Sequence, residues 1–181
     1  MVNLPVGVLA LQGAVGSHAG ILRGLGAKVR EVRTPAHLTD LAGLVIPGGE
    51  SSVMMLGIER EKLAEPLREF ASSGRPVLGT CAGMIVLDKE HLGLLGVVAE
   101  RNAFGRQSHS FECTLPVQEV GTVHAVFIRA PRVVQCSTDV AVLAEIDGYP
   151  VAVQQGNLMA ISFHPELVGE TRLHRRFLDS C

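Results

Sequence analysis

The chain has 181 residues, a formal net charge of −2, 47% hydrophobic residues and a mean hydropathy of +0.30. This length suits one domain, residues 1–181, with a sizeable core. The balanced charge gives no sign of a nucleic-acid partner or a polybasic membrane anchor. No apolar run approaches the roughly 20 residues of a membrane span, and the N-terminus lacks signal-peptide features. We therefore expect a cytoplasmic protein.

The cysteines give no sign of a metal site. No two of them form a C-x-x-C pair, the spacing typical of zinc and thioredoxin-type sites. In a reducing compartment they are expected to be free thiols. They are Cys81, Cys113, Cys136 and Cys181.

The first half of the chain alternates apolar runs with helical patterns. Residues 6–11 form a continuous apolar run, typical of a parallel strand buried on both faces. Alternation of strands and helices predicts an α/β fold with an open, mostly parallel, doubly wound sheet and helices on both faces. The expected strands are 6–11, 28–32, 43–46 and 77–78, and the expected helices are 17–25, 59–73 and a segment from residue 85.

From about residue 96 the pattern changes to short strand-like runs. The turns Asp147-Gly148 and Gly156-Asn157 indicate antiparallel hairpins added to the sheet. A last helix is expected at residues 171–178. The expected strands in this half are 97–99, 111–117, 123–128, 140–146, 151–155 and 158–162.

In an open α/β sheet, ligands bind beyond the carboxyl ends of the strands. Glycine-bearing loops fall at such ends after the first, third and fourth expected strands. They are Gln12-Gly13, the stretch Pro47-Gly48-Gly49-Glu50-Ser51, and the stretch around Cys81. The topology therefore predicts a site where these loops meet.

Cys81 lies in the pattern Gly79-x-Cys81-x-Gly83, between a strand and a helix. This pattern has the form of a nucleophile elbow, in which small neighbours let the chain turn sharply. A following helix would favour the thiolate, the reactive form of cysteine. A buried structural cysteine beside tightly packed glycines is the alternative, and the pattern alone does not decide between them.

A nucleophilic cysteine needs a base and usually a residue that orients the base. His164 follows an apolar strand, and Glu166, two residues later, is able to accept a hydrogen bond from its imidazole. The alternative is a strand-end histidine in a turn. The other histidines are expected on the surface or at helix caps: His18, His37, His91, His109, His124 and His174.

Catalysis at a carbonyl also needs N–H donors for the developing oxyanion. Gly49 in the Gly48-Gly49 loop is one candidate donor, and Ala82, directly after Cys81, is another. The alternative for the loop is an ordinary turn that caps the next helix through Ser51 or Ser52.

Together these motifs resemble class I, or triad, glutamine amidotransferases. More narrowly, the sequence is similar to the glutaminase subunits of pyridoxal 5′-phosphate (vitamin B6) synthase. The Cys and His-Pro-Glu motifs carry the broad resemblance. The narrower one rests on residues 9–15, 100–107, 127–131 and 162–167.

The resemblance implies a flavodoxin-like fold and a Cys-His-Glu triad. Cys81 would attack the side-chain amide of L-glutamine and form a γ-glutamyl thioester. His164 would take the thiol proton and protonate the departing ammonia, and Glu166 would orient His164. Because all triad positions are occupied, a catalytically silent or redox-sensing domain is the weaker interpretation.

The resemblance also implies a glutamine-binding set and a residue that couples the site to a partner. Arg101, Ile128 and Arg129 match positions that bind glutamine; for the arginines, the alternative is a surface ion pair. Gln12 matches the loop that meets the synthase subunit. The rest of the glutamine-binding set is Gly48, Gly49, Glu50 and Ser51.

The expected partner is the synthase (lyase) subunit of pyridoxal 5′-phosphate synthase, in a large hetero-oligomer that receives the ammonia. No cofactor is expected in this chain, because pyridoxal phosphate is the product of the whole complex. The chain is shorter than many relatives between Glu90 and His91 and ends soon after its last helix begins. A glutaminase that feeds another synthase, or a related cysteine hydrolase, is the alternative enzyme.

Overall fold

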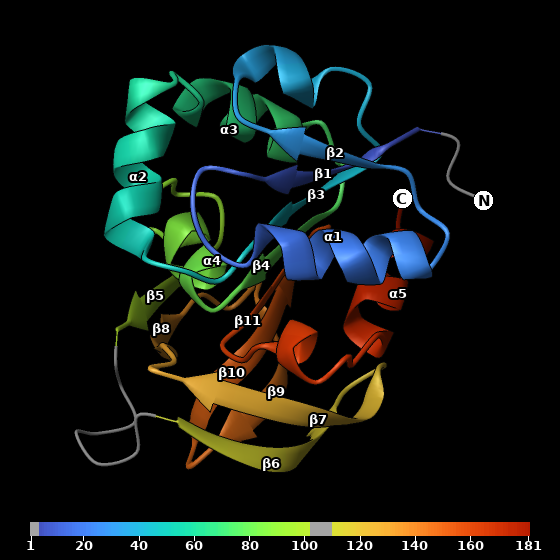
Figure 1. Cartoon of the computed structure of the whole chain (residues 1–181). Helices are drawn as coiled ribbons and strands as arrows, with labels where there is room; N and C mark the ends of the chain where they lie inside the picture. Colours follow the sequence, from blue (N-terminus) through green and yellow to red (C-terminus); the bar gives the residue numbers. More distant parts are fainter. Residues whose placement is uncertain (1–3, 102–109) are drawn as a thin grey trace.

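The computed structural model describes residues 4–101 and 110–181, with a seven-stranded sheet at its centre (Figure 1). The strand order is β2-β1-β3-β4-β11-β10-β9. The first five of these run parallel, and β10 and β9 are antiparallel to their neighbours. Their bounds are β2 Val29–Val32, β1 Val6–Leu9, β3 Gly43–Ile46, β4 Val77–Thr80, β11 Leu158–Ile161, β10 Tyr149–Gln155 and β9 Ala141–Ile146.

Helices cover both faces of this sheet, as the sequence predicts. One face carries α1 and α5, which Figure 1 shows in front of the strands, and the other carries α2, α3 and α4. Short 3₁₀ helices follow β2 and β11. The bounds are α1 Val15–Gly24, η1 Pro35–Leu38, α2 Ser51–Arg60, α3 Ala64–Ser72, α4 Ala82–Leu87, η2 Pro165–Leu167 and α5 Arg172–Asp179.

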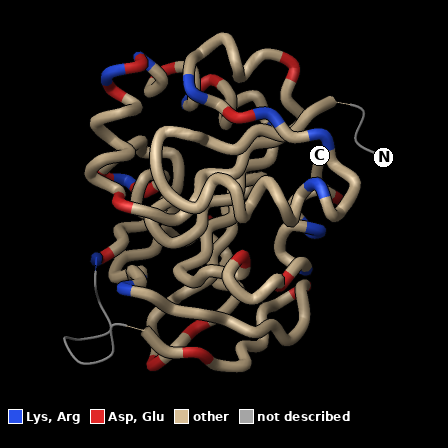
Figure 2. The backbone as a smooth tube through the Cα atoms, in the orientation of Figure 1, with Lys and Arg blue, Asp and Glu red and all other residues tan. Residues whose placement is uncertain are grey.

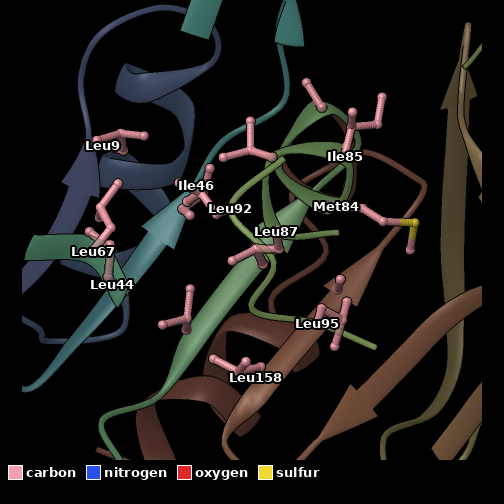
Figure 3. Packing of buried hydrophobic residues seen from close by; sticks show 14 of the residues in the cluster. Leu9, Leu44, Ile46, Leu67, Met84, Ile85, Leu87, Leu92, Leu95 and Leu158 are labelled. Atoms are coloured by element: carbon pink, nitrogen blue, oxygen red, sulfur yellow. The ribbon is translucent and has the colours of Figure 1, made fainter. Parts of the chain in front are cut away.

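The central strands are buried on both faces because their residues alternate between two apolar cores. In β3, Leu44 and Ile46 pack into the core under α2, α3 and α4, while Val45 packs into the core under α1 and α5. This period-2 alternation is the normal consequence of strand geometry. Figure 3 shows the first core, where side chains from β1, β3 and β11 meet those of α3 and α4.

Two antiparallel ribbons lie outside the main sheet. The β6–β7 ribbon packs against the core under α1 and α5, where Leu115 and Phe127 are buried. The other ribbon pairs β5 with β8. The bounds are β5 Val97–Glu100, β6 Ser110–Val117, β7 Gly121–Ile128 and β8 Arg132–Cys136.

Two expectations about the second half need correction. Only β9, β10 and β11 of that half join the main sheet, and β8 was not expected at all. The β8 segment is largely exposed, so it lacks the buried pattern that identifies a strand. The free state of all four cysteines agrees with the sequence.

The single helix expected over residues 59–73 is wrong. Helix α2 starts earlier, at Ser51, and ends at Arg60, and α3 begins at Ala64. Pro66 explains the break, because in a continuous helix its missing N–H and its ring would face the carbonyl of Lys62. Lys62 instead takes a left-handed backbone with a φ of 55°.

Charged residues of both signs lie scattered over the outer parts of the chain, and the central strands show none (Figure 2). The parallel strands β1, β3, β4 and β11 contain no Asp, Glu, Lys or Arg. Among residues 4–101 and 110–181, no helix has both the length and the apolar character that crossing a membrane requires.

Candidate functional site

A cavity of about 360 Å³ opens beyond the carboxyl ends of the parallel strands. It lies where the topology of the sheet predicts a ligand site. Every residue that the sequence analysis placed in the site lines this cavity. They are Gln12, Gly48, Gly49, Glu50, Ser51, Cys81, Ala82, Arg101, Ile128, Arg129, His164 and Glu166.

Cys81 joins β4 to α4 in a strained backbone conformation, with φ 49° and ψ −105°. A positive φ at a non-glycine residue costs energy and persists only where the surroundings enforce it. Its N–H donates to the Ile161 carbonyl at 2.7 Å. A Cβ on Gly79 would lie 2.8 Å from the Gly83 carbonyl oxygen, and a Cβ on Gly83 would collide with the Ile46 carbonyl. The glycines are therefore needed for this turn.

His164 reaches Cys81 because β11 lies beside β4 in the sheet. The two strands pair in parallel, with Ile161 opposite Thr80, so the chain after β11 leaves the sheet beside the chain after β4. The His164 N–H donates to the Val126 carbonyl of β7 at 2.8 Å. Its imidazole Nδ1 lies 2.7 Å from Glu166 Oε1, the contact expected between a base and the residue that orients it.

The electrostatics of these side chains favour a charged histidine. Burial lowers the pKa of His164, but hydrogen bonds to Cys81 and Glu166 and their negative charges raise it to about 10. Burial raises the pKa of the Glu166 carboxyl, but the hydrogen bond from His164 and the neighbouring imidazoles bring it below its usual value. An imidazolium beside a cysteine stabilises the thiolate.

The Gly48-Gly49 loop is held against the loop that follows β1. The Ala14 N–H donates to the Gly48 carbonyl at 3.0 Å. Because a trans peptide points its N–H opposite to its C=O, the Gly49 N–H faces away from Ala14. Gln12 contributes a second contact, since its side-chain oxygen accepts from the Glu50 N–H at 2.7 Å.

The Gly48-Gly49 stretch leads directly into α2, so the capping alternative is partly correct. The cap residue is Glu50, whose side chain accepts from the Ser52 N–H at 3.4 Å, and not Ser51 or Ser52. Capping and donation to an oxyanion use different groups of this loop, and the two roles are compatible.

The arginines of the expected glutamine-binding set are exposed and not buried. Arg101 forms an ion pair with Glu50 and donates to the Ser52 hydroxyl at 2.9 Å. Arg129 has a left-handed backbone with a φ of 43°. The carbonyl of Ile128 lies 4.0 Å from the Cys81 sulfur. Residues 102–107 of the resemblance and His109 lie outside the described residues.

Sequence reasoning missed two buried histidines behind the triad. His18 of α1 and His174 of α5 are both fully buried, although surface or cap positions were expected. Their rings meet at 2.8 Å, and His18 Nε2 lies 3.1 Å from the Thr80 hydroxyl. The helical spacing carried a signal, because His18 lies four residues before the buried Leu22 on the same helix face.

Comparisons with known proteins agree on one family. The model of the SNO glutamine amidotransferase family matches residues 8–181. The pyridoxal 5′-phosphate synthase subunit PdxT of Shouchella clausii is 49% identical over 183 residues, covering 97% of this chain and 94% of that protein. The subunit of the same name from Clavibacter sepedonicus is 50% identical over 186 residues, covering 96% and 89%.

A solved structure agrees with these relatives. A crystal structure of a glutamine amidotransferase has a TM-score of 0.92 to this chain at 43% sequence identity, and the match covers 97% of both chains. Sequence and structure thus agree on one family over nearly the whole length of the chain. The chain belongs to the SNO glutamine amidotransferase family.

Proposed function

We propose that this protein hydrolyses L-glutamine to L-glutamate and ammonia and delivers the ammonia to a pyridoxal 5′-phosphate synthase subunit. The observation that carries the proposal is the placement of His164 between Cys81 and Glu166 in one cavity. A base held 2.7 Å from a buried carboxylate, beside a cysteine in a strained turn, fits nucleophilic catalysis at an amide. The family membership of the chain supplies glutamine as the amide.

The triad acts in two steps. The Cys81 thiolate attacks the side-chain carbonyl of glutamine, and His164 gives its proton to the departing nitrogen, so ammonia leaves and a γ-glutamyl thioester remains. His164, now neutral, then removes a proton from water as the water attacks the thioester. Glutamate leaves and the thiolate and imidazolium re-form. Glu166 keeps the imidazole in one orientation through both steps.

The oxyanion of each tetrahedral intermediate needs N–H donors from the backbone. We assign this role to the amides of Gly49 and Ala82. The Gly48 carbonyl is held by Ala14, so the Gly49 amide is fixed before the substrate arrives. Fixed donors are worth more than mobile ones because they cost no reorganisation during the reaction.

The charged groups at the cavity mouth suit the zwitterionic end of glutamine. Glu50 and Arg101 pair with each other in the free site. Substrate would replace this pair, with its α-amino group on the Glu50 carboxylate and its α-carboxylate on an arginine. The planar fork of Arg101 or Arg129 is able to hold both carboxylate oxygens. Gly48, Ser51 and Ile128 complete the wall around the substrate.

Ammonia must reach its acceptor without mixing with water, because protonation removes its nucleophilicity. The relatives named as synthase subunits support a synthase partner for this chain. Gln12 is suited to couple the partner to the site, since its side chain holds the Glu50 amide beside the oxyanion loop. We propose that the two subunits work within a large hetero-oligomer in the cytoplasm.

Glutamine hydrolysis measured with and without the pyridoxal phosphate synthase subunit tests this proposal. We expect weak activity alone, clear stimulation by the partner, and a loss of more than about 10³-fold in Cys81→Ala. Turnover that survives Cys81→Ala would refute the assigned nucleophile. Strong turnover with no response to the partner would favour a glutaminase that serves a different synthase.

A second experiment isolates the role in ammonia supply. An excess of ammonium salt should let the synthase subunit form pyridoxal phosphate without this chain. If ammonium cannot replace the chain, its contribution to the complex is something other than ammonia.

A further inference from the structure

His18 lies in the core behind the proposed triad, next to Thr80 and Glu166. Its helix, α1, lies on the same face of the sheet as α5, which carries His174 (Figure 1). One ring nitrogen of His18, Nε2, is 3.1 Å from the hydroxyl of Thr80, the residue directly before Cys81. The same nitrogen lies 3.6 Å from Glu166 Oε2.

The second oxygen of the Glu166 carboxylate lacks a hydrogen-bond donor within the described residues. Oε1 accepts from His164, but Oε2 is buried and has no hydrogen-bond partner there. A buried, charged oxygen is costly to leave without a donor. At 3.6 Å the His18 contact is longer than a hydrogen bond. Contacts of this kind are often long in a free site and shorten when substrate binds.

Burial keeps both inner histidines neutral. Burial lowers the pKa of His18, with Glu166 acting in the opposite direction and His164 lowering it further. Burial and the neighbouring His18 lower the pKa of His174 to about 3. The charge of Glu166 and a hydrogen bond to the backbone of Glu170 act in the opposite direction. Each ring therefore carries one N–H, and its position decides what faces the carboxylate.

The His18–His174 pair has two possible arrangements of its ring protons. One of them places an N–H toward Glu166 Oε2 and none on His174 Nδ1, and these are the two buried atoms that lack a hydrogen-bond partner among the described residues. If His18 carries its proton on Nε2, an N–H dipole faces Glu166 Oε2, and His18 Nδ1 accepts from His174 Nε2–H. His174 Nδ1 is then a bare lone pair, and it has no hydrogen-bond partner among the described residues. The reverse arrangement lets His174 donate to the backbone of Glu170 and lets the Thr80 hydroxyl donate to His18 Nε2, but it also turns that Nε2 lone pair toward the charged Glu166 carboxylate. The first arrangement is favoured, because an N–H facing the charged Glu166 carboxylate stabilises the pair more than a hydrogen bond to the neutral backbone of Glu170.

We propose that His18 is a positioning residue for glutamine hydrolysis, whose Nε2–H holds the Glu166 carboxylate in place so that Glu166 keeps His164 oriented. His174 fixes the tautomer and the ring plane of His18. This inference rests on the proposed function of the triad. It adds a histidine from α1, contacting Thr80 and Glu166, to a triad drawn from the ends of β4 and β11.

Matched variants separate positioning from simple core filling. The side-chain amide of glutamine overlays the Nε2 position of histidine, whereas that of asparagine overlays Nδ1. His18→Gln therefore keeps an N–H toward Glu166, and His18→Asn removes it while keeping a neutral polar side chain. His18→Leu fills the space with no donor.

In the presence of the synthase subunit, we expect His18→Asn and His18→Leu to lower kcat by about 10- to 100-fold. That is the range for hydrogen bonds that orient metal-binding histidines. KM should change by less than about 2-fold, because His18 does not line the cavity. His18→Gln should retain kcat within about 3-fold. Equal kcat losses in Asn and Gln, or full kcat in Leu, would overturn the proposal.

Two NMR measurements complete the test. In the wild-type chain, ¹⁵N shifts of labelled histidine should show His18 protonated at Nε2 and bare at Nδ1; the opposite tautomer would overturn the proposal without any variant. The pKa of His164 should fall in His18→Asn and not in His18→Gln, and an unchanged pKa in both would also overturn it. These readings need no turnover, so they remain informative if the chain proves not to hydrolyse glutamine.

Discussion

Gly48 lies where the proposed oxyanion loop meets two members of the triad. A Cβ on Gly48 would lie 2.5 Å from His164 Cε1 and 3.3 Å from Cys81 Cβ. His164 cannot move aside freely, because Glu166 holds its ring at 2.7 Å. Gly48→Ala should therefore displace the base or the loop and lower kcat by about 10²-fold or more. The free energy of unfolding should change little in comparison.

Gly20 of α1 is a suitable control for this substitution. A Cβ on Gly20 would meet nothing within 4 Å. Gly20→Ala should raise the free energy of unfolding by about 0.5–1 kcal/mol, as expected for glycine inside a helix, and leave kcat unchanged. Turnover of Gly48→Ala equal to that of Gly20→Ala would contradict the assigned position of the loop.

The charge state of His164 predicts how the free energy of unfolding depends on pH. NMR titration of labelled histidine should show His164 protonated at neutral pH and losing its proton near its pKa of about 10. Because an unfolded histidine titrates near 6.5, the folded chain binds more protons between these values. His164 therefore stabilises the fold fully below about pH 6.5, and this contribution is lost as pH rises through about 10.

Glu166→Gln isolates the carboxylate's share of this effect. It keeps a hydrogen-bonding group near His164 but removes the negative charge, so the pKa of His164 should fall. A His164 titration unchanged by Glu166→Gln would mean that the carboxylate does not set its charge.

At the residue scale, the sequence motifs predicted which side chains lie together, but not how far each side chain is buried. The elbow glycines and the His-Pro-Glu run placed Cys81, His164 and Glu166 in one cavity. His18 carries no such motif, and its role depends on tertiary contacts with Thr80 and Glu166 that sequence spacing cannot show. The surface ion pair stated as the alternative for Arg101 is present, but its partner, Glu50, lies far away in the sequence, so local spacing could not identify it.

At the scale of elements, the break between α2 and α3 is a helix end at which a lysine takes a backbone conformation that favours glycine. Lys62 has a φ of 55°, and the next N–H, that of Leu63, donates to the Ile58 carbonyl at 2.8 Å. This is the bonding of a helix end that usually carries glycine in the left-handed position. A side chain there costs about 1 kcal/mol.

Lys62→Gly should relieve that strain. We expect the free energy of unfolding to rise by up to about 1 kcal/mol in urea titrations, reduced by the larger entropy of glycine in the unfolded chain. The reciprocal change is Gly74→Ala after α3, where φ is 82°, and it should be destabilising. If Lys62→Gly lowers stability, the lysine side chain makes contacts that outweigh its strained backbone.

Hairpins could be predicted from turns, whereas the partners of a strand could not. The Gly156-Asn157 turn indicates that β10 and β11 pair, and they do. Nothing local indicates that β11 also pairs in parallel with β4, far back in the chain, although this pairing brings His164 to Cys81. Parallel pairing depends on chain crossovers, so its register appears only when the whole sheet is assembled.

At the scale of the whole molecule, the α/β class was predictable because continuous apolar strands alternate with helices in the first half. The same strands explain why the two cores are not independent. In β11, Leu158 and Ala160 belong to the core under α2, α3 and α4, while Met159 and Ile161 belong to the core under α1 and α5. Loss of either core would expose one face of every central strand.

The chain should therefore unfold as one cooperative domain. Phe70 is buried in the core under α2, α3 and α4, and Phe177 in the core under α1 and α5. Phe70→Leu and Phe177→Leu should each lower the free energy of unfolding by about 1–2 kcal/mol. Far-ultraviolet circular dichroism reports the whole backbone. The fluorescence of the single tyrosine, Tyr149 of β10, reports its local surroundings, which include Arg132 of β8 over its ring at 3.9 Å.

Both signals should change at one urea midpoint in the wild-type chain, and each substitution should move both midpoints by the same amount. Phe70→Leu is the more demanding test of cooperative unfolding. It alters the core on one face of the sheet, whereas Tyr149 lies in β10, next to the edge strand β9. A tyrosine midpoint that stays in place as the circular dichroism midpoint falls would divide the chain into two folding units. The shared strands would then transmit less stability between the cores than their alternating burial implies.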